Sequence, residues 1–114
     1  MVETPEFALR VTENGSGPVV LLAGELDMTT SPQLKACLRD FTGERVTLDF
    51  SDVTFMDSTA ISVLVAAHKR AWLKGGAVIL HGVQPAQMRV FEITGLLDHF
   101  DFDGQSLLED SDAS

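Results

Sequence analysis

A carboxylate and two hydroxyls, Asp57-Ser58-Thr59, interrupt an otherwise largely apolar segment, "VTFMDSTAIS", which runs from Val53 to Ser62. Their oxygens can accept hydrogen bonds from the free N–H groups at the start of a helix, so both Asp57 and Ser58 are candidate N-caps. A hydroxyl at such a position can also carry a phosphate, because the free N–H groups and the positive end of the helix dipole favour the added negative charge. The triplet therefore has two interpretations, a helix cap or a modification site.

The residues around the triplet do not match the common catalytic patterns. A hydrolase serine would lie in G-x-S-x-G, but Met56 and Ala60 occupy the two glycine positions around Ser58. The three histidines are dispersed, Cys37 is the single cysteine, and the glycines form no phosphate-binding pattern. Receiver domains resemble one another in using a lysine late in the fold, whereas none follows Lys74. We therefore expect a protein that is not an enzyme and that has no cofactor and no bound metal.

Composition is typical of a globular protein with a single domain. The chain has 114 residues, of which 45% are hydrophobic and 22% charged, and no apolar run approaches the roughly 20 residues that span a bilayer. The N-terminus lacks the basic and apolar regions of an export signal, so we expect a cytoplasmic protein. We expect one domain over residues 1–114, with a core over about 5–108 and a flexible acidic tail over 109–114.

The charge balance constrains the class of partner. Eight Lys and Arg against seventeen Asp and Glu give a formal net charge of −9. Such a surface repels phosphate backbones and anionic lipid, so we expect neither nucleic-acid binding nor membrane binding. A basic protein is the partner that this charge favours.

Hydrophobic periodicity predicts an α/β fold. Five segments have the pattern of strands: 7–13, 18–26, 45–51, 77–82 and 100–102. Three helices are predicted from apolar spacing and capping residues: Ser31 to Phe41, Ser58 to Gly75, and Pro85 to Gly95. The turn "ENGSGP" predicts an antiparallel hairpin of the first two strands, and "GQSLLED" is expected to add a final helical turn or two. The later alternation of strand and helix predicts a mixed, mostly parallel sheet with helices packed on it.

Several side chains on these helices have structural interpretations. Ser31 is expected to cap the first helix, with Pro32 at the first helical position. Cys37 lies on the apolar stripe of that helix and is interpreted as a small buried hydrophobe. His68 and Trp72 share the apolar face of the second helix, so we expect a packed histidine rather than a metal ligand.

Two loops, "GELDMTTS" and "DFSDVTFMDST", follow neighbouring strands in this scheme. In open parallel sheets, function concentrates where strand carboxyl ends meet helix N-termini. If the loops lie side by side, a phosphate on Ser58 joins Asp27, Asp52 and Asp57, and it would block a partner without unfolding the protein. The neighbouring apolar residues have two open interpretations, ordinary core or an exposed apolar rim for the partner: Met28, Phe55 and Met56.

Three segments resemble the STAS domain family, and within it the bacterial anti-sigma factor antagonists that consist of this domain alone. They are "LLAGELDMTTSPQL", "VTLDFSDVTFMDSTAISVLVAA" and "MRVFEITGLLDHFDF", in the order of the family. In that family the unphosphorylated antagonist binds an anti-sigma factor with serine kinase activity and so frees a sigma factor for transcription. The kinase phosphorylates the antagonist and ends the interaction, and a PP2C-type phosphatase reverses the modification. The resemblance implies a small cytoplasmic switch protein.

The resemblance also assigns residues. The family's phosphoacceptor corresponds to Ser58, with Thr59 as a secondary candidate, and the acidic residue of the family's "GELD"-like segment corresponds to Asp27. The partner is expected to contact the two loops at Asp27, Met28, Thr29, Asp52, Phe55, Met56, Asp57, Ser58 and Thr59.

Two departures from the family pattern leave a second function open. Ala60 and Ser62 stand where family members commonly have glycine. Losing a glycine stabilises a helix interior by about 0.8–1 kcal/mol, and a stiffer first turn would present Ser58 less readily to a kinase. The alternative is a STAS subunit without a switch in a larger assembly, such as an ABC lipid transporter or a stress-signalling scaffold.

Overall fold

The computed structural model describes residues 7–15, 17–41 and 43–103. The expected acidic tail and the extra turn in "GQSLLED" lie outside these residues. The strands are β1 (Phe7–Glu13), β2 (Pro18–Leu26), β3 (Arg45–Met56), β4 (Ala77–His81) and β5 (Asp101–Asp103). The helices are α1 (Ser31–Leu38), α2 (Ser58–Leu73), α3 (Pro85–Ile93) and the short 3₁₀ helix η1 (Leu97–His99). No helix within the described ranges has the length and apolar character needed to cross a membrane.

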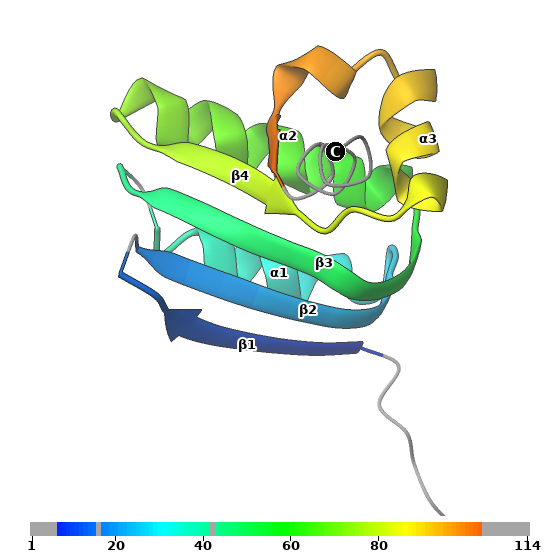
Figure 1. The fold of residues 1–114 in the computed structure, drawn as a ribbon, viewed down its shortest axis with the longest axis horizontal. Coiled ribbons are helices and arrows are strands. Elements are labelled where there is room, and N and C mark those ends of the chain that lie inside the picture. Colours follow the sequence, from blue (N-terminus) through cyan, green and yellow to red (C-terminus); the bar gives the residue numbers. More distant parts are fainter. Residues whose placement is uncertain (1–6, 16, 42, 104–114) are drawn as a thin grey trace, which may run out of the picture.

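The strands form one sheet in the order in which they occur along the chain, β1-β2-β3-β4-β5 (Figure 1). β1 pairs antiparallel with β2, whereas β2, β3, β4 and β5 are parallel to their neighbours. This confirms the α/β class and the mixed, mostly parallel sheet. It also confirms the hairpin at the N-terminal side of the sheet.

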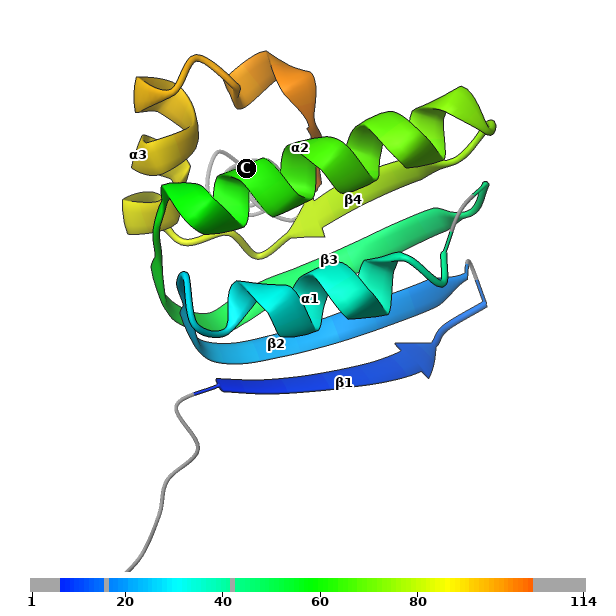
Figure 2. The same ribbon diagram turned by 180° about the vertical axis from the view of Figure 1, so that it is seen from behind.

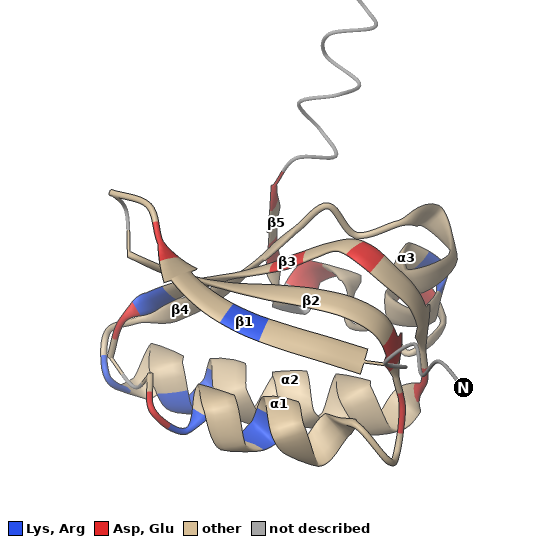
Figure 3. Ribbon diagram, turned by 90° about the horizontal axis from the view of Figure 1, so that it is seen from below, with Lys and Arg blue, Asp and Glu red and all other residues tan. Residues whose placement is uncertain are grey.

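Helices α1 and α2 pack side by side on one face of the sheet, as Figures 2 and 3 show. The connections from β2 to β3 and from β3 to β4 both step in the same direction across the sheet. Right-handed crossovers that step in one direction place their helices on the same face. The core between helices and sheet is formed by inward-facing strand and helix residues, among them Val20, Leu34, Leu48, Phe50, Leu64 and Leu80.

Strand β3 is longer than the sequence predicts, since it continues past Ser51 to Met56. Its register with β2 shifts twice, so that β3 has two more residues than β2 over the paired stretch. Buried positions along β3 accordingly change from every second residue to every third: Val46, Leu48, Phe50, Val53 and Met56. The expected end of the strand was wrong because a bulge breaks the period-two alternation by which strands are recognised.

Two helix predictions also need correction. Thr30, not Ser31, is the N-cap of α1, and the helix ends at Leu38 before reaching Phe41. Trp72 is 68% exposed instead of lying on the packed face of α2. The expected stop of α2 is confirmed, because Gly75 follows the helix with a φ of +87°, a left-handed conformation that favours glycine.

Candidate functional site

The loops after β2 and β3 lie next to each other at one edge of the sheet. The two strands are parallel neighbours, and Leu26 pairs with Met56 at their carboxyl ends. The backbone N–H of Asp57 donates to the carbonyl of Leu26 at 3.2 Å, which joins the two connections directly. The condition for a shared surface, that the Asp27 and Asp57 loops are side by side, is therefore met (Figure 1).

Asp27 organises the connection from β2 to α1. Its Oδ1 accepts hydrogen bonds from the backbone N–H of Thr29 at 2.9 Å and of Thr30 at 3.1 Å. The Thr30 hydroxyl donates to the carbonyl of Glu25 at 2.7 Å and accepts from the N–H of Asp27 at 2.9 Å. The Asp27 and Thr30 side chains thus accept hydrogen bonds from three of the four backbone N–H groups of residues 27–30, which favours one shape of this connection.

Asp57 is the N-cap of α2. It has extended backbone angles, and its Oδ1 accepts from the N–H of Thr59 at 2.9 Å and of Ala60 at 3.2 Å. Of the two candidate caps in the sequence, the carboxylate therefore has this role and Ser58 does not.

Ser58 is the first residue of α2, and its side chain is exposed. Among the described residues, no side chain is hydrogen-bonded to the Ser58 hydroxyl, so no neighbouring base activates it as a nucleophile. Ser62, one turn further along, donates its hydroxyl to the carbonyl of Ser58 at 3.3 Å. The acceptor candidate is accessible at a helix start whose cap is supplied by another residue.

The remaining predicted contact residues fall into two groups. Met28 is 71% exposed and Phe55 is 50% exposed, so they form an apolar rim beside the acidic loops, where Thr29 is exposed as well. Met56 is 4% exposed and belongs to the core. Its side chain is not available to a partner, and the core interpretation is the correct one for this residue.

Asp52 is also separated from the loops. It lies within β3, paired with Ala23, and it lines a shallow pocket of the sheet with Arg10 and Leu21. The strand rises roughly 3.3 Å per residue, which places Asp52 on the order of 10 Å from Met56 along the strand. The expectation that Asp52 joins Asp27 and Asp57 around Ser58 is therefore wrong, and the reason is the unrecognised length of β3.

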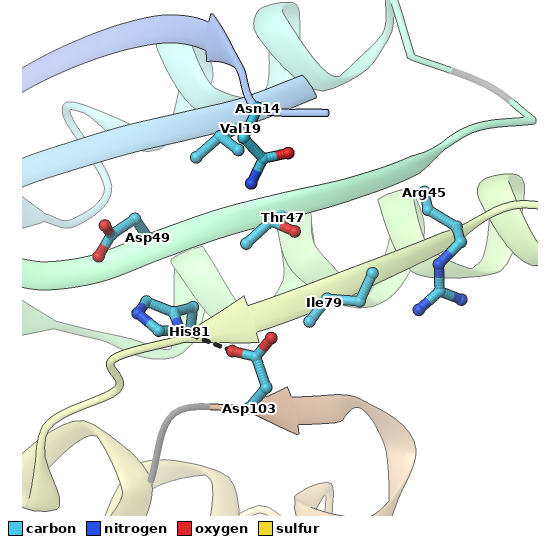
Figure 4. Close-up of a pocket in the computed structure, with 8 residues that line it drawn as sticks. All are labelled: Asn14, Val19, Arg45, Thr47, Asp49, Ile79, His81 and Asp103. Carbon is cyan, nitrogen blue, oxygen red and sulfur yellow. Dashed lines mark hydrogen bonds and ion pairs between the residues drawn. The ribbon is translucent and has the colours of Figure 1, made fainter. Parts of the chain in front are cut away.

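A larger pocket lies on the sheet and was not predicted from the sequence (Figure 4). It has a volume of about 490 Å³ and is lined by residues of four strands and the β1–β2 turn: Asn14, Val19, Arg45, Thr47, Asp49, Ile79, His81 and Asp103. His81 Nδ1 and Asp103 Oδ1 are 2.6 Å apart, but both side chains are about half exposed. A pair this open to solvent contributes little to stability.

His68 and Cys37 have the structural roles that their positions predict. His68 Nδ1 accepts a hydrogen bond from the N–H of Val78 at 3.3 Å, and its ring lies 5.3 Å from that of Phe100. This confirms a packed histidine. Cys37 is half-buried against the core, and burial, with a smaller contribution from Asp40, raises the pKa of its thiol. A raised pKa lowers the fraction of reactive thiolate.

Comparisons with known proteins point to one family. The family model described as "STAS domain" matches residues 8–109. An anti-sigma-B factor antagonist of Listeria monocytogenes is 35% identical over 82 residues, which cover 69% of this chain and 72% of that protein. The anti-sigma-B factor antagonist of Bacillus subtilis is 33% identical over 98 residues, covering 84% and 90% respectively. The crystal structure of an anti-sigma factor antagonist from Mycobacterium paratuberculosis superposes with a TM-score of 0.76 at 25% identity and covers 89% of each chain.

Proposed function

Since the chain belongs to the STAS domain family, we propose that it is an anti-sigma factor antagonist whose binding is switched off by phosphorylation of Ser58. The observation that carries this proposal is the division of roles at the start of α2. Asp57 supplies the cap with two hydrogen bonds, and Ser58 contributes an exposed hydroxyl that is not used in the fold. Modification of Ser58 then leaves the domain folded.

The binding surface in this proposal is the edge formed by the two loops. It has the half-buried carboxylates of Asp27 and Asp57, the exposed side chains of Met28 and Phe55, and the Ser58 hydroxyl. Apolar residues beside acidic ones fit a partner surface that presents apolar pockets and basic side chains. The named relatives from Listeria and Bacillus support an anti-sigma factor as that partner.

The switch follows from the energetics of a buried charge. A phosphate carries about −1.5 to −2 charges at pH 7, and on Ser58 it would be adjacent to the Asp57 carboxylate. An interface formed around a neutral hydroxyl would have to desolvate that charge and accommodate its bulk. The proposal therefore includes a kinase, the anti-sigma factor itself, that acts on Ser58 or secondarily on Thr59, and a PP2C-type phosphatase in the same cytoplasmic compartment.

A second function is favoured by the first turn of α2. Ala60 is fully buried, and the Ser62 hydroxyl is bonded to the carbonyl of Ser58. Both features stiffen the turn that a kinase would have to engage. They fit a STAS subunit that binds constitutively within a larger assembly, such as a transporter or a signalling scaffold.

The direct test compares substitutions at Ser58 in binding to the anti-sigma factor of the same organism. Ser58→Asp is expected to weaken binding by roughly 100-fold or more, since an unpaired charge buried at an interface costs about 3–5 kcal/mol. Ser58→Ala is expected to bind like the unmodified protein. Thr12→Asp adds the same charge on an exposed position of β1 and is expected to leave the affinity unchanged. Equal affinity of Ser58→Asp and Ser58→Ala would reject the switch and favour the constitutive subunit.

A further inference from the structure

The positive charge of this acidic chain is concentrated on the two packed helices. Five of the eight Lys and Arg residues lie within segments 31–39 and 58–74, and none of the seventeen Asp and Glu residues does. These five are Lys35, Arg39, Lys69, Arg70 and Lys74. Figure 3 shows the segregation, because α1 and α2 carry blue segments and no red ones along their lengths. The charge of the helix surface is therefore positive, whereas the net charge of the protein is negative.

The charges of these cations are not neutralised by ion pairs among the described residues. Within the described ranges, none of the five is in an ion pair; the His81–Asp103 pair lies on the sheet. Four of the five side chains are exposed, and Arg70 is half-buried. Unpaired cations on one surface of a protein with a net charge of −9 create a local positive potential. An acidic group is what this surface attracts.

The same surface has exposed apolar side chains. Trp72 and Leu73, at the carboxyl-terminal end of α2, are 68% and 70% exposed. Exposed Trp is unusual on a monomer surface and is enriched, together with Arg, at protein interfaces. Ser62, Lys69 and Leu73 are exposed along one stripe of α2, so its outward side has a hydroxyl, a cation and an apolar side chain.

Two shallow grooves flank that stripe. One lies between the helices, with a volume of about 180 Å³, and is lined by Lys35 on α1 and by Thr59, Ser62, Val63, Ala66 and Arg70 on α2. Its small side chains permit close approach of another backbone, and a cation from each helix lines it. The other groove lies on the far side of the stripe and is lined by Val65, His68, Lys69, Trp72 and Leu73.

We infer that the α1–α2 surface, defined by these five cations with Trp72 and Leu73, is a docking surface for an acidic amphipathic helix of a protein partner. Carboxylates of that helix would face Lys35, Lys69 and Arg70, and its apolar side chains would cover Ala66, Trp72 and Leu73. A helix lying over the stripe of α2 would meet both flanking grooves, as when the apolar face of an amphipathic helix packs against a grooved surface. The inference concerns a partner of the opposite charge to the one expected at the loop edge, and it does not depend on Ser58.

A protein helix fits these observations better than an anionic membrane or a nucleic acid. The acidic loops at both ends of the helices include Asp57 before α2 and Asp40 after α1. Asp40 follows Arg39 directly, and Asp57 precedes Lys69 by twelve residues, so carboxylates border the cationic surface at both ends of the helices. An extended anionic sheet of lipid or a long phosphate backbone would meet both signs, whereas a single short helix meets the cations alone.

The test uses the full chain and a designed probe. The probe is an amphipathic peptide of about 18 residues, or five helical turns, with Glu flanking a Leu and Ala face, and its control replaces every Glu with Lys. Trp72 is the only tryptophan of the chain, so its fluorescence reports contact at this surface directly. The Glu peptide is expected to shift the Trp72 emission to the blue in a saturable and salt-dependent manner. Amide chemical shifts are expected to change in α1 and α2 and not in β1 or α3.

Matched variants distinguish the effect of this surface on binding from the effect of the protein's net charge. Lys35→Glu with Arg70→Glu is expected to weaken peptide binding roughly tenfold or more, and Arg10→Glu with Arg89→Glu, which changes the total charge equally on β1 and α3, by less than about twofold. If Arg70→Glu impairs folding, Lys69→Gln with Lys74→Gln at exposed positions is expected to weaken binding several-fold. Three results would each overturn the inference. The Glu and Lys peptides could bind equally, or the Arg10 and Arg89 variant could lose as much affinity as the Lys35 and Arg70 variant. Anionic phosphatidylserine vesicles could also shift the Trp72 emission to the blue while the Glu peptide does not.

Discussion

The two connections that enter α1 and α2 lie side by side at one edge of the sheet and are built in different ways. The connection from β2 to α1 is a loop of four residues, in which Asp27 and Thr30 bond to each other and to the surrounding backbone. The connection from β3 to α2 is a single residue, Asp57. The first uses its polar groups to fix its own shape, whereas the second leaves a hydroxyl free immediately after the cap. A modification of the Ser58 hydroxyl, after the second connection, is therefore expected to have little effect on the fold.

The largest expected effect on stability comes from Thr30, which is buried in the first connection. Thr30→Val keeps the shape but removes the hydroxyl that bonds to Glu25 and Asp27. We expect a loss of about 1–3 kcal/mol in the free energy of unfolding, because the partly buried backbone groups of Glu25 and Asp27 lose their partner. Urea denaturation measures this. Thr59→Val, two residues after the second connection and within α2, is the control and should change stability by less than about 0.5 kcal/mol. Similar losses in the two variants would show that the connections are not built differently.

The second prediction concerns the cap of α2. Asp57→Ala removes the acceptor of two backbone N–H groups and should cost about 1 kcal/mol. Asp57→Asn keeps an oxygen acceptor and should recover most of that loss. Both are measured by thermal or urea unfolding. If Ser58→Ala were as destabilising as Asp57→Ala, the cap would have been assigned to the wrong residue.

A smaller effect of the opposite sign is expected at Ser31. This residue is 1% exposed, and its hydroxyl is buried at the start of α1 without a hydrogen-bond partner among the described residues. Ser31→Ala removes the unpaired group and favours the helix, so we expect stabilisation by about 0.5–1 kcal/mol. Calorimetry would detect the rise in Tm. A clear destabilisation would reveal a partner for this hydroxyl.

The smallest expected effect on stability is at Ser58 itself. Ser58→Asp places a carboxylate at a helix N-terminus, which is favourable, but next to Asp57, which is not. The two contributions oppose each other, and we expect a change of less than about 0.5 kcal/mol. Unfolding measured beside the binding assay separates a loss of affinity from a loss of structure. A strongly destabilised variant would mean that Ser58 is part of the fold.

The fold class and the start of α2 at Asp57 could be predicted from the sequence, because the signals for them are local. Pro32, Pro85 and Gly75 mark helix boundaries through their fixed or left-handed backbone, and the structure has helices ending or beginning close to them. Asp57 and Ser58 were recognised as the start of α2 because capping chemistry depends on neighbouring backbone groups only.

What the sequence could not supply depends on contacts between distant segments. The bulges of β3 are visible only in its pairing with β2, so the sequence pattern ends the strand too early and predicts a loop at Asp52. Trp72 follows the half-buried Val65 and His68 on the flank of α2, whereas the buried face at this end of the helix is formed by Ala71. The pocket that includes His81 and Asp103 joins residues 22 positions apart in sequence, and the β4–β5 pairing brings them together.

The most direct test of the central claim is to map modifications on the chain purified from its native host, by intact mass and peptide sequencing, together with the protein that co-purifies with it. The account predicts a fraction carrying one phosphate, located on Ser58, and an unphosphorylated fraction that alone retains an anti-sigma factor. A chain that is unmodified at Ser58 under all growth conditions, and held in a stable complex of another kind, would contradict it.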